Sequence, residues 1–245
     1  MGTSASYHPS LKGKPEWGKL SSEVTTGCNG QSLDKEKLAN IFGKYLGVIG
    51  GANKASSGKS AVMGRAGLKS ATKLGGFLGS LISSGFNIEK SLKEVGITDL
   101  SNKSLSDIVN NLIEYCSGPA STIDDKAAKE ATRLLLEEIV EKADTIDSLK
   151  EQLKKILNPE TLDDIIVKYF GYYIFEHLSV MFWEKLSKQK GEKNRGKLFK
   201  HIKDFILEKL KVVNIKTPLK NINWGSDRAK EIISKIFKNV LKVFE

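Results

Sequence analysis

The spacing of hydrophobic residues predicts a chain built almost throughout from amphipathic helices. Over residues 34–48 apolar side chains recur every three or four positions, the repeat of an α-helix, and the same period returns along most of the chain. No run of alternating β-branched residues requires a sheet, although a short strand pair around residues 212–222 is a weaker alternative. The pattern therefore predicts an all-α fold, with helices at about 34–48, 104–116, 124–143, 146–157, 159–189, 196–212 and 227–244.

The composition divides the chain into three parts. Residues 1–32 are rich in Ser, Thr, Gly and Pro and have no apolar period, which predicts an extended N-terminal arm. Residues 33–85 read as a Gly/Ala-rich basic helical segment, because 11 of the 22 glycines lie within residues 43–85 and small residues allow close packing of a helix pair. Residues 86–245 are expected to form a helical bundle domain with a basic C-terminal part. Ser32 and Ser226 are the expected N-caps of the helices at 34–48 and 227–244.

The most apolar stretch, residues 165–183, approaches the length of a membrane span. Lys168, Glu176 and His177 lie inside it, and each would cost a few kcal/mol at the centre of a bilayer. We therefore interpret the stretch as the central helix of the bundle and expect no membrane span.

Length and composition restrict the class of protein. The 245 residues are enough for a large core, and the 40% hydrophobic content together with a net charge of +10 indicates a basic globular protein. Two cysteines are too few for a disulfide framework, and no secretory signal is evident at the start, so we expect a cytoplasmic protein. The three histidines and two cysteines lack the spacing of a ligand knuckle, so neither a metal site nor a cofactor is expected.

Two motifs suggest chemistry only weakly. The Gly58-Lys59-Ser60 sequence would suit a phosphate-binding loop, but the glycine that such a loop needs five positions earlier is replaced by Asn53, and the preceding segment has a helical period. We interpret it as a glycine-rich loop between helices. His177 lies beside Glu176 on the apolar central helix, where a hydrogen-bonded core histidine is more common than a general base. The chain is accordingly predicted not to be an enzyme.

The positive charge is concentrated towards the C-terminus. Residues 185–245 contain 17 basic and 6 acidic side chains, and a second group of cations recurs at four-residue steps within the Gly/Ala-rich segment. That group lies on one face of a helix whose other face carries Leu68, Leu74, Phe77, Leu78 and Leu81. A nucleic-acid-binding module or adaptor is therefore one functional alternative, and binding of residues 43–85 to a membrane surface is a weaker one. The candidate basic surface comprises Arg65, Lys69, Lys73, Lys197, Lys200 and Lys203.

The amino terminus offers a different chemistry. The small Gly2 permits removal of Met1, which would expose an unhindered α-amine. Such an amine ordinarily has a pKa of roughly 7.7–8.0, so a useful fraction of it is neutral and nucleophilic at pH 7.

The Met-Gly-Thr-Ser-Ala-Ser-Tyr start, the polar arm with Trp17 and the Gly/Ala-rich basic helices around residues 50–85 resemble the QatB family of bacterial Qat anti-phage defence systems. The resemblance is strongest over the first 85 residues, and beyond Phe86 it is a general helical pattern. Members of this family are encoded beside an ATPase, a QueC-like enzyme of the 7-deazaguanine pathway (QatC) and a TatD-like nuclease. The resemblance thus implies antiviral defence, with these three proteins as partners.

The same resemblance implies a role for the arm. A QueC-like enzyme activates a carboxylate by adenylation and captures it with a nitrogen nucleophile, which in this family is the N-terminal glycine of the small component. On this chain the acceptor of the 7-deazaguanine-type base would be Gly2. The segment entering the partner's active site would be Thr3, Ser4, Ala5 and Ser6, and the residues anchoring it outside would be Tyr7, Pro9, Leu11 and Trp17.

Overall fold

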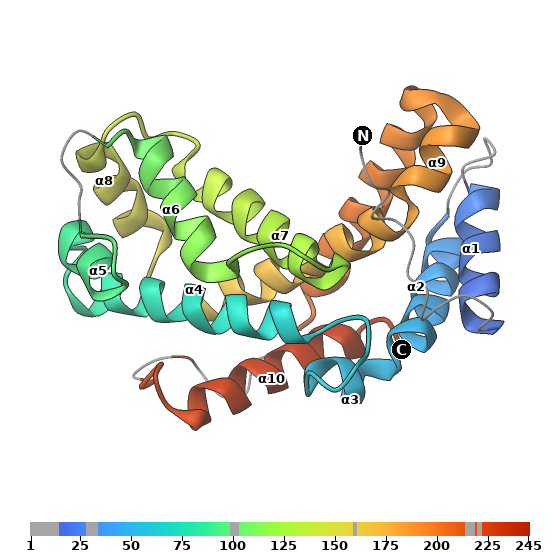
Figure 1. The fold of residues 1–245 in the computed structure, drawn as a ribbon, viewed down its shortest axis with the longest axis horizontal. Coiled ribbons are helices and arrows are strands. Elements are labelled where there is room, and N and C mark those ends of the chain that lie inside the picture. The colour runs from blue at the N-terminus through green and yellow to red at the C-terminus, as the bar shows by residue number, and fades with distance from the viewer. Residues whose placement is uncertain (1–14, 28–33, 99–102, 159–160, 214–218, 220–221) are drawn as a thin grey trace.

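A computed structural model describes residues 15–27, 34–98, 103–158, 161–213, 219 and 222–245; for residues 15, 27 and 184–195 it describes the backbone alone. Within these residues the chain forms helices joined by turns and short connections, with no strand, which confirms the all-α prediction (Figure 1). The helices are α1 (Pro15–Gly27), α2 (Lys35–Ile49), α3 (Gly51–Ser56), α4 (Arg65–Ser83), α5 (Ile88–Glu94), α6 (Leu105–Ser117), α7 (Ile123–Val140), α8 (Ile146–Ile156), α9 (Leu162–Leu210) and α10 (Asp227–Lys242).

The first half of α9 is the centre of the core. Tyr169, Phe170 and Tyr173 are fully buried there, and the ring of Phe170 stacks on that of Phe237 from α10 with centroids 4.5 Å apart. Helix α7 packs along α9, and α4 lies between α7 on one side and α10 on the other (Figure 1). The prediction of a central core helix over residues 165–183 is confirmed, and no helix in the described part of the chain has the length and apolarity to cross a membrane.

Helix α9 reverses direction, although its backbone is helical from Leu162 to Leu210. The Phe175 and Phe199 rings are in edge contact at 6.3 Å, whereas 24 residues of straight helix would separate them by roughly 36 Å. Gly171 likewise faces Leu210 and Ile206, so the two halves of α9 are antiparallel (Figure 1). The two helices predicted at 159–189 and 196–212 correspond to these halves.

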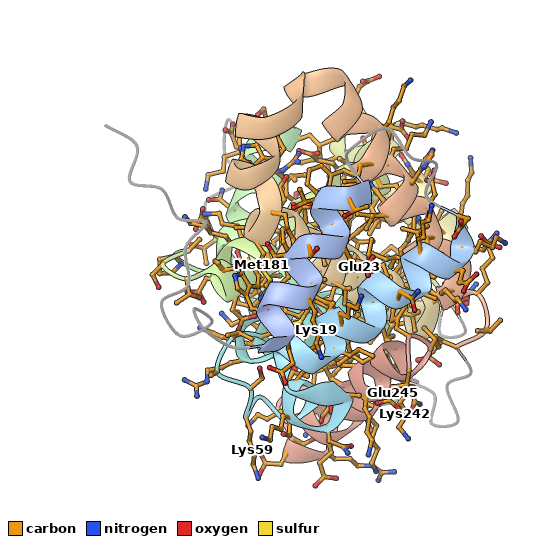
Figure 2. The ribbon with its side chains drawn as sticks, turned by 90° about the vertical axis from the view of Figure 1, so that its right-hand side faces the viewer. Lys19, Glu23, Lys59, Met181, Lys242 and Glu245 are labelled. Atoms are coloured by element: carbon orange, nitrogen blue, oxygen red, sulfur yellow. The ribbon has the colours of Figure 1, made fainter. Side chains whose placement is uncertain are left out.

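The N-terminal part differs from the prediction. Residues 1–14 and 28–33 lie outside the described residues, but residues 15–27, expected to be part of an extended arm, form helix α1. Leu20 and Val24 are fully buried, and the Trp17 ring stacks on Phe182 of α9 with centroids 5.2 Å apart. Figure 2 shows α1 beside α2, with Lys19 and Glu23 along it. The apolar residues 17, 20 and 24 have the spacing of one helix face. The Ser, Thr and Gly residues around them favour loops, and for that reason the sequence analysis assigned this segment to the arm.

Local capping fixes most helix starts. Ser226 caps α10 as predicted, accepting a hydrogen bond from the backbone N–H of Ala229. The N-cap of α2 is Asp34 and not Ser32, because the Asp34 carboxylate accepts from the backbone N–H of Lys37. Residues 214–218 and 220–221 lie outside the described residues, and the described residues around them form no strand, so the alternative strand pair gains no support.

Large aromatic rings pack directly against glycines of α4. A Cβ at Gly67 would overlap the Tyr173 ring, and a Cβ at Gly75 would overlap the indole of Trp224. At Gly79 the added Cβ would lie 2.5 Å from the Trp224 indole nitrogen. The glycine-rich composition therefore allows rings from α9 and from the segment before α10 to lie directly on the α4 backbone.

Candidate functional site

The candidate site is a groove on the side of the molecule where α4 faces α10, and the start of α4 defines one end of it. A turn after α3 brings the chain through Gly64, whose φ of 115° lies in a region that L side chains rarely adopt. A Cβ at this position would overlap the backbone carbonyl of Ala55. Only glycine therefore allows the turn and α3 to approach so closely.

Two side chains from distant elements hold the start of α4. The Asp124 carboxylate, from the first turn of α7, accepts hydrogen bonds from the backbone N–H groups of Gly64 (3.2 Å) and Ala66 (2.9 Å). The Tyr173 hydroxyl donates to the same carboxylate and accepts from the Gly64 N–H at 2.7 Å. A carboxylate at a helix N-terminus is favoured by the helix dipole and by the unpaired N–H groups of the first turn. Helices α7 and α9 thus fix the direction in which α4 leaves the turn.

The three cations predicted on one face of this helix all line the groove. Arg65 and Lys69 are exposed, and neither has an ion-pair or hydrogen-bond partner among the described residues. Lys73 differs, because its ammonium donates to the backbone carbonyl of Tyr115 at 2.6 Å and lies over the Tyr115 ring. Its positive charge therefore stabilises the C-terminal end of α6, where the helix dipole is negative.

The groove has a volume of about 720 Å³. Leu68, which the sequence assigned to the face opposite the cations, is half-buried against the core and also lines the groove with them. The other wall is α10, held against α3 by a 2.5 Å hydrogen bond from the Ser234 hydroxyl to the carbonyl of Ser56. The groove is lined by Ser56, Ser57, Gly58, Arg65, Leu68, Lys69, Thr72, Lys73, Lys230, Glu231 and Ser234.

The Gly-Lys-Ser sequence forms a loop between helices, as predicted. The backbone N–H groups of Lys59 and Ser60 both donate to the carbonyl of Lys54, and that of Gly58 donates to Ala55. Amides engaged in this way cannot surround a phosphate as a phosphate-binding loop does. Of this sequence only Gly58 lines the groove, next to Ser56 and Ser57.

His177 is a core residue, as predicted. It is 1% exposed, its Nε2 donates to the carbonyl of Val62 at 2.8 Å, and its Nδ1 lies 3.0 Å from the Tyr45 hydroxyl. Cys116 is also fully buried, and burial raises the pKa of its thiol to about 12. Neither side chain is placed to act on an external substrate.

The remaining predicted basic residues lie on the second half of α9, away from the groove (Figure 1). Lys197 and Lys200 are exposed there. Lys203 is half-buried, with its ammonium over the Tyr172 ring, 4.7 Å from its centroid. The structure therefore separates the candidate basic surface into two regions instead of joining it into one.

The predicted N-terminal site residues from Gly2 to Leu11 lie outside the described residues. Trp17 alone is described, and its ring contact with Phe182 lies within this chain, a contact that the sequence analysis did not anticipate. Its assignment as an anchor on a partner stays a prediction.

Sequence reasoning missed Gly64, Asp124 and Tyr173 as determinants of the site. Asp124 gave only the ordinary signal of an acid in the first turn of its own helix, and Tyr173 only that of a core aromatic residue. Their roles depend on contacts across 60 and 109 positions of the chain, which periodicity does not report.

The half-buried carboxylate of Glu176 also gives the folded protein a measurable pH dependence. Burial raises the pKa of Glu176 to about 7, helped by the charge of Glu130 and opposed by the charges of Lys203 and Arg133. The folded protein therefore retains a proton that the unfolded chain releases near pH 4.3. Stability is then lost as the pH rises from about 4.3 to about 7, and the cost stays constant above that range.

We expect Glu176→Gln to remove this pH dependence. The variant should be more stable than the parent by about 1–3 kcal/mol at pH 8 and by far less at pH 4.5, because the glutamine carries no charge to bury. Urea unfolding followed by circular dichroism at both pH values measures the difference. An equal change at pH 4.5 and pH 8 would contradict the assignment to ionisation.

A family model described as QatB, Qat anti-phage system associated protein, matches residues 50–244. The chain belongs to the QatB family. It is thus a component of the Qat anti-phage defence system, as the resemblance implied. No match was found among curated proteins or among solved structures.

The family match covers some regions of the chain and not others. The match covers the Gly/Ala-rich helices and continues through the helical part beyond Phe86, which the sequence resemblance had treated as a general pattern. It does not cover residues 1–49, which include Gly2 and Trp17. The groove between α4 and α10 lies wholly within the matched residues.

Proposed function

We propose that this QatB-family protein is a substrate and scaffold and not an enzyme. Its helical body docks on a QueC-like enzyme, QatC, and presents Gly2, after removal of Met1, for conjugation to a 7-deazaguanine-type base. The ATPase and the TatD-like nuclease of the system are further partners. Membership of the family supports a role within a multi-component defence system.

The observation that carries this proposal is the attachment of α1 to the body. Stacking of Trp17 on Phe182, burial of Leu20 and Val24, and an ion pair between Glu23 and Lys44 hold α1 against α9 and α2. Gly2 precedes the start of this helix by 13 residues, a length of chain that spans at most about 45 Å. Because α1 is fixed to the helical body, the 13 residues before it could bring the Gly2 amine into the active site of a bound partner.

The proposed reaction forms an amide. Adenylation of a deazaguanine carboxylate by ATP releases pyrophosphate, and the Gly2 amine then attacks the activated carbonyl carbon. The new C–N bond forms, the bond to AMP breaks, and the amine loses a proton. Small side chains at Thr3, Ser4, Ala5 and Ser6 keep the main chain narrow enough to enter a tunnel, and Tyr7, Pro9 and Leu11 would provide apolar contacts outside it.

The test is intact and peptide mass spectrometry of the full chain, produced alone and together with the QueC-like enzyme. We expect a mass increment on the peptide that begins at Gly2, and only in the presence of the partner. In Gly2→Leu, retention of Met1 should abolish the increment and with it protection from phage. Gly18→Ala is the matched control, because a Cβ at Gly18 meets nothing within 4 Å.

Two results would contradict the proposal. One is an unmodified Gly2 beside a QueC-like enzyme shown to be active, and the other is full phage protection by Gly2→Leu. Salt-dependent DNA binding by the unmodified full chain, lost in Lys197→Glu/Lys200→Glu, would then favour the nucleic-acid-binding alternative.

A further inference from the structure

The groove between α4 and α10 is not used by the proposed N-terminal chemistry. Its volume of about 720 Å³ lies within the roughly 300–1,000 Å³ typical of small-molecule sites. Its position is set by glycine and by long-range hydrogen bonds at Gly64, so it is a feature of the folded body and not of the arm.

The positive charge of the groove walls favours an anionic ligand. Residues 51–83, which include α3, the turn and α4, contain five basic and no acidic residues, and α10 contains five basic against two acidic. Arg65 and Lys69 stand one helical turn apart on the groove wall without partners among the described residues. A guanidinium and an ammonium so placed suit a phosphate, which Arg binds in a bidentate manner and Lys binds as a point charge.

The wall that carries the cations is also partly apolar. Leu68 lines the groove on α4 together with Arg65 and Lys69, with Thr72 one turn beyond it and Gly58 of the preceding loop packed close to Leu68. A simple inorganic ion would leave this surface in water, whereas a flat ring attached to the phosphate would cover it.

The extent of the lining limits the size of the ligand. On α4 it runs from Arg65 to Lys73, about 12 Å at 1.5 Å per residue, and on α10 from Lys230 to Ser234, about 6 Å. A peptide helix or a stretch of nucleic acid would need a longer track. These dimensions fit one compact ligand.

Glu231 adds a second requirement, because it is the acidic residue of the lining. The Lys230 ammonium is paired with the Asp227 carboxylate at 2.9 Å, so Lys230 does not neutralise the charge of Glu231. A carboxylate opposite two cations repels a ligand that is anionic throughout and accepts hydrogen bonds from hydroxyl groups. A sugar between the ring and the phosphate supplies such donors.

We propose that this groove binds a nucleoside phosphate, with the phosphate at Arg65 and Lys69, the sugar towards Glu231 and the base against Leu68. This goes beyond the proposed conjugation of Gly2 and does not depend on it.

The probe is N-methylanthraniloyl-ADP, titrated with the full chain and followed by fluorescence anisotropy, with ADP, adenosine and inorganic pyrophosphate as competitors. We expect saturable binding, competed more strongly by ADP than by adenosine or pyrophosphate. Arg65→Glu/Lys69→Glu should weaken binding at least tenfold. Lys197→Glu/Lys200→Glu changes the net charge equally at exposed positions outside the groove, and should change the affinity less than twofold.

Circular dichroism verifies that both double variants are folded, and Arg65→Gln/Lys69→Gln repeats the test without charge reversal. Absence of saturable binding to the parent chain would overturn the proposal. So would equal losses in the two Glu variants, which would indicate general attraction to a basic protein. Full competition by adenosine, or pyrophosphate binding as tightly as ADP, would exclude a site that reads both phosphate and base.

Discussion

Gly64→Ala is expected to lower the free energy of unfolding by about 4 kcal/mol or more, and at 37 °C this can prevent folding. Two costs add. A φ of 115° is strained for any residue with a Cβ, at roughly 1–3 kcal/mol, and the new methyl group would overlap the Ala55 carbonyl. That carbonyl belongs to helix α3 and already accepts from Gly58, so it cannot move aside without breaking the turn. Urea unfolding measured by circular dichroism gives the difference.

Gly43→Ala is the matched control for that experiment. Gly43 lies on the exposed side of α2, and a Cβ there meets nothing within 4 Å. The same substitution should therefore stabilise the protein by about 0.5–1 kcal/mol, because alanine loses less entropy in a helix than glycine does. If the two variants differed by less than about 1 kcal/mol, the steric account of Gly64 would be wrong.

The elements predicted correctly from the sequence are those whose own side chains determine them. Helices α2, α6, α7, α8 and α10 have a continuous apolar face and begin close to an expected position. Helix α1 was missed because its Gly, Ser and Thr content favours loops, while its stability comes from Trp17 and Leu20 packing on the body. The sequence predicted separate helices at 159–189 and 196–212 but not their antiparallel packing, because the contacts that hold the reversal within α9, such as Phe175 with Phe199, are tertiary.

The candidate groove was predicted only on one wall. Arg65, Lys69 and Lys73 recur at four-residue steps, and that period alone places them together on α4. The second wall comes from α10, more than 150 residues later, and periodicity within either helix says nothing of their pairing. The same limit explains why Leu68 was assigned to the face opposite the cations: periodicity groups it with the other apolar residues of α4, whereas its place in the groove depends on the packing of α10.

Asp124→Ala is expected to cost about 3 kcal/mol of stability, more than a surface substitution and less than the change at Gly64. The carboxylate accepts from the N–H groups of Gly64 and Ala66 and from the Tyr173 hydroxyl. Removing one acceptor leaves these donors without it in a partly buried site, and each such loss costs about 1–3 kcal/mol, partly recovered where water enters. Thermal and urea unfolding measure the effect.

The neighbouring Asp125 provides the control for this variant. Its carboxylate lies in the same first turn of α7 and carries the same charge, but it accepts only from Ser121 and Thr122 at the start of its own helix. Asp125→Ala should therefore cost about 1 kcal/mol, the ordinary value of a helix cap. Equal costs for the two variants would show that Asp124 contributes nothing across the α4–α7 contact.

A double-mutant cycle with Tyr173→Phe then isolates the contribution of the long-range hydrogen bond between Tyr173 and Asp124. The Phe ring keeps the packing against Gly67 and removes only the hydroxyl that joins Asp124 to Gly64. We expect a coupling of about 1 kcal/mol between Asp124 and Tyr173, and none between Asp125 and Tyr173. Since these hydrogen bonds set the start of α4, Asp124→Ala should also weaken nucleotide binding at Arg65 and Lys69, whereas Asp125→Ala should not.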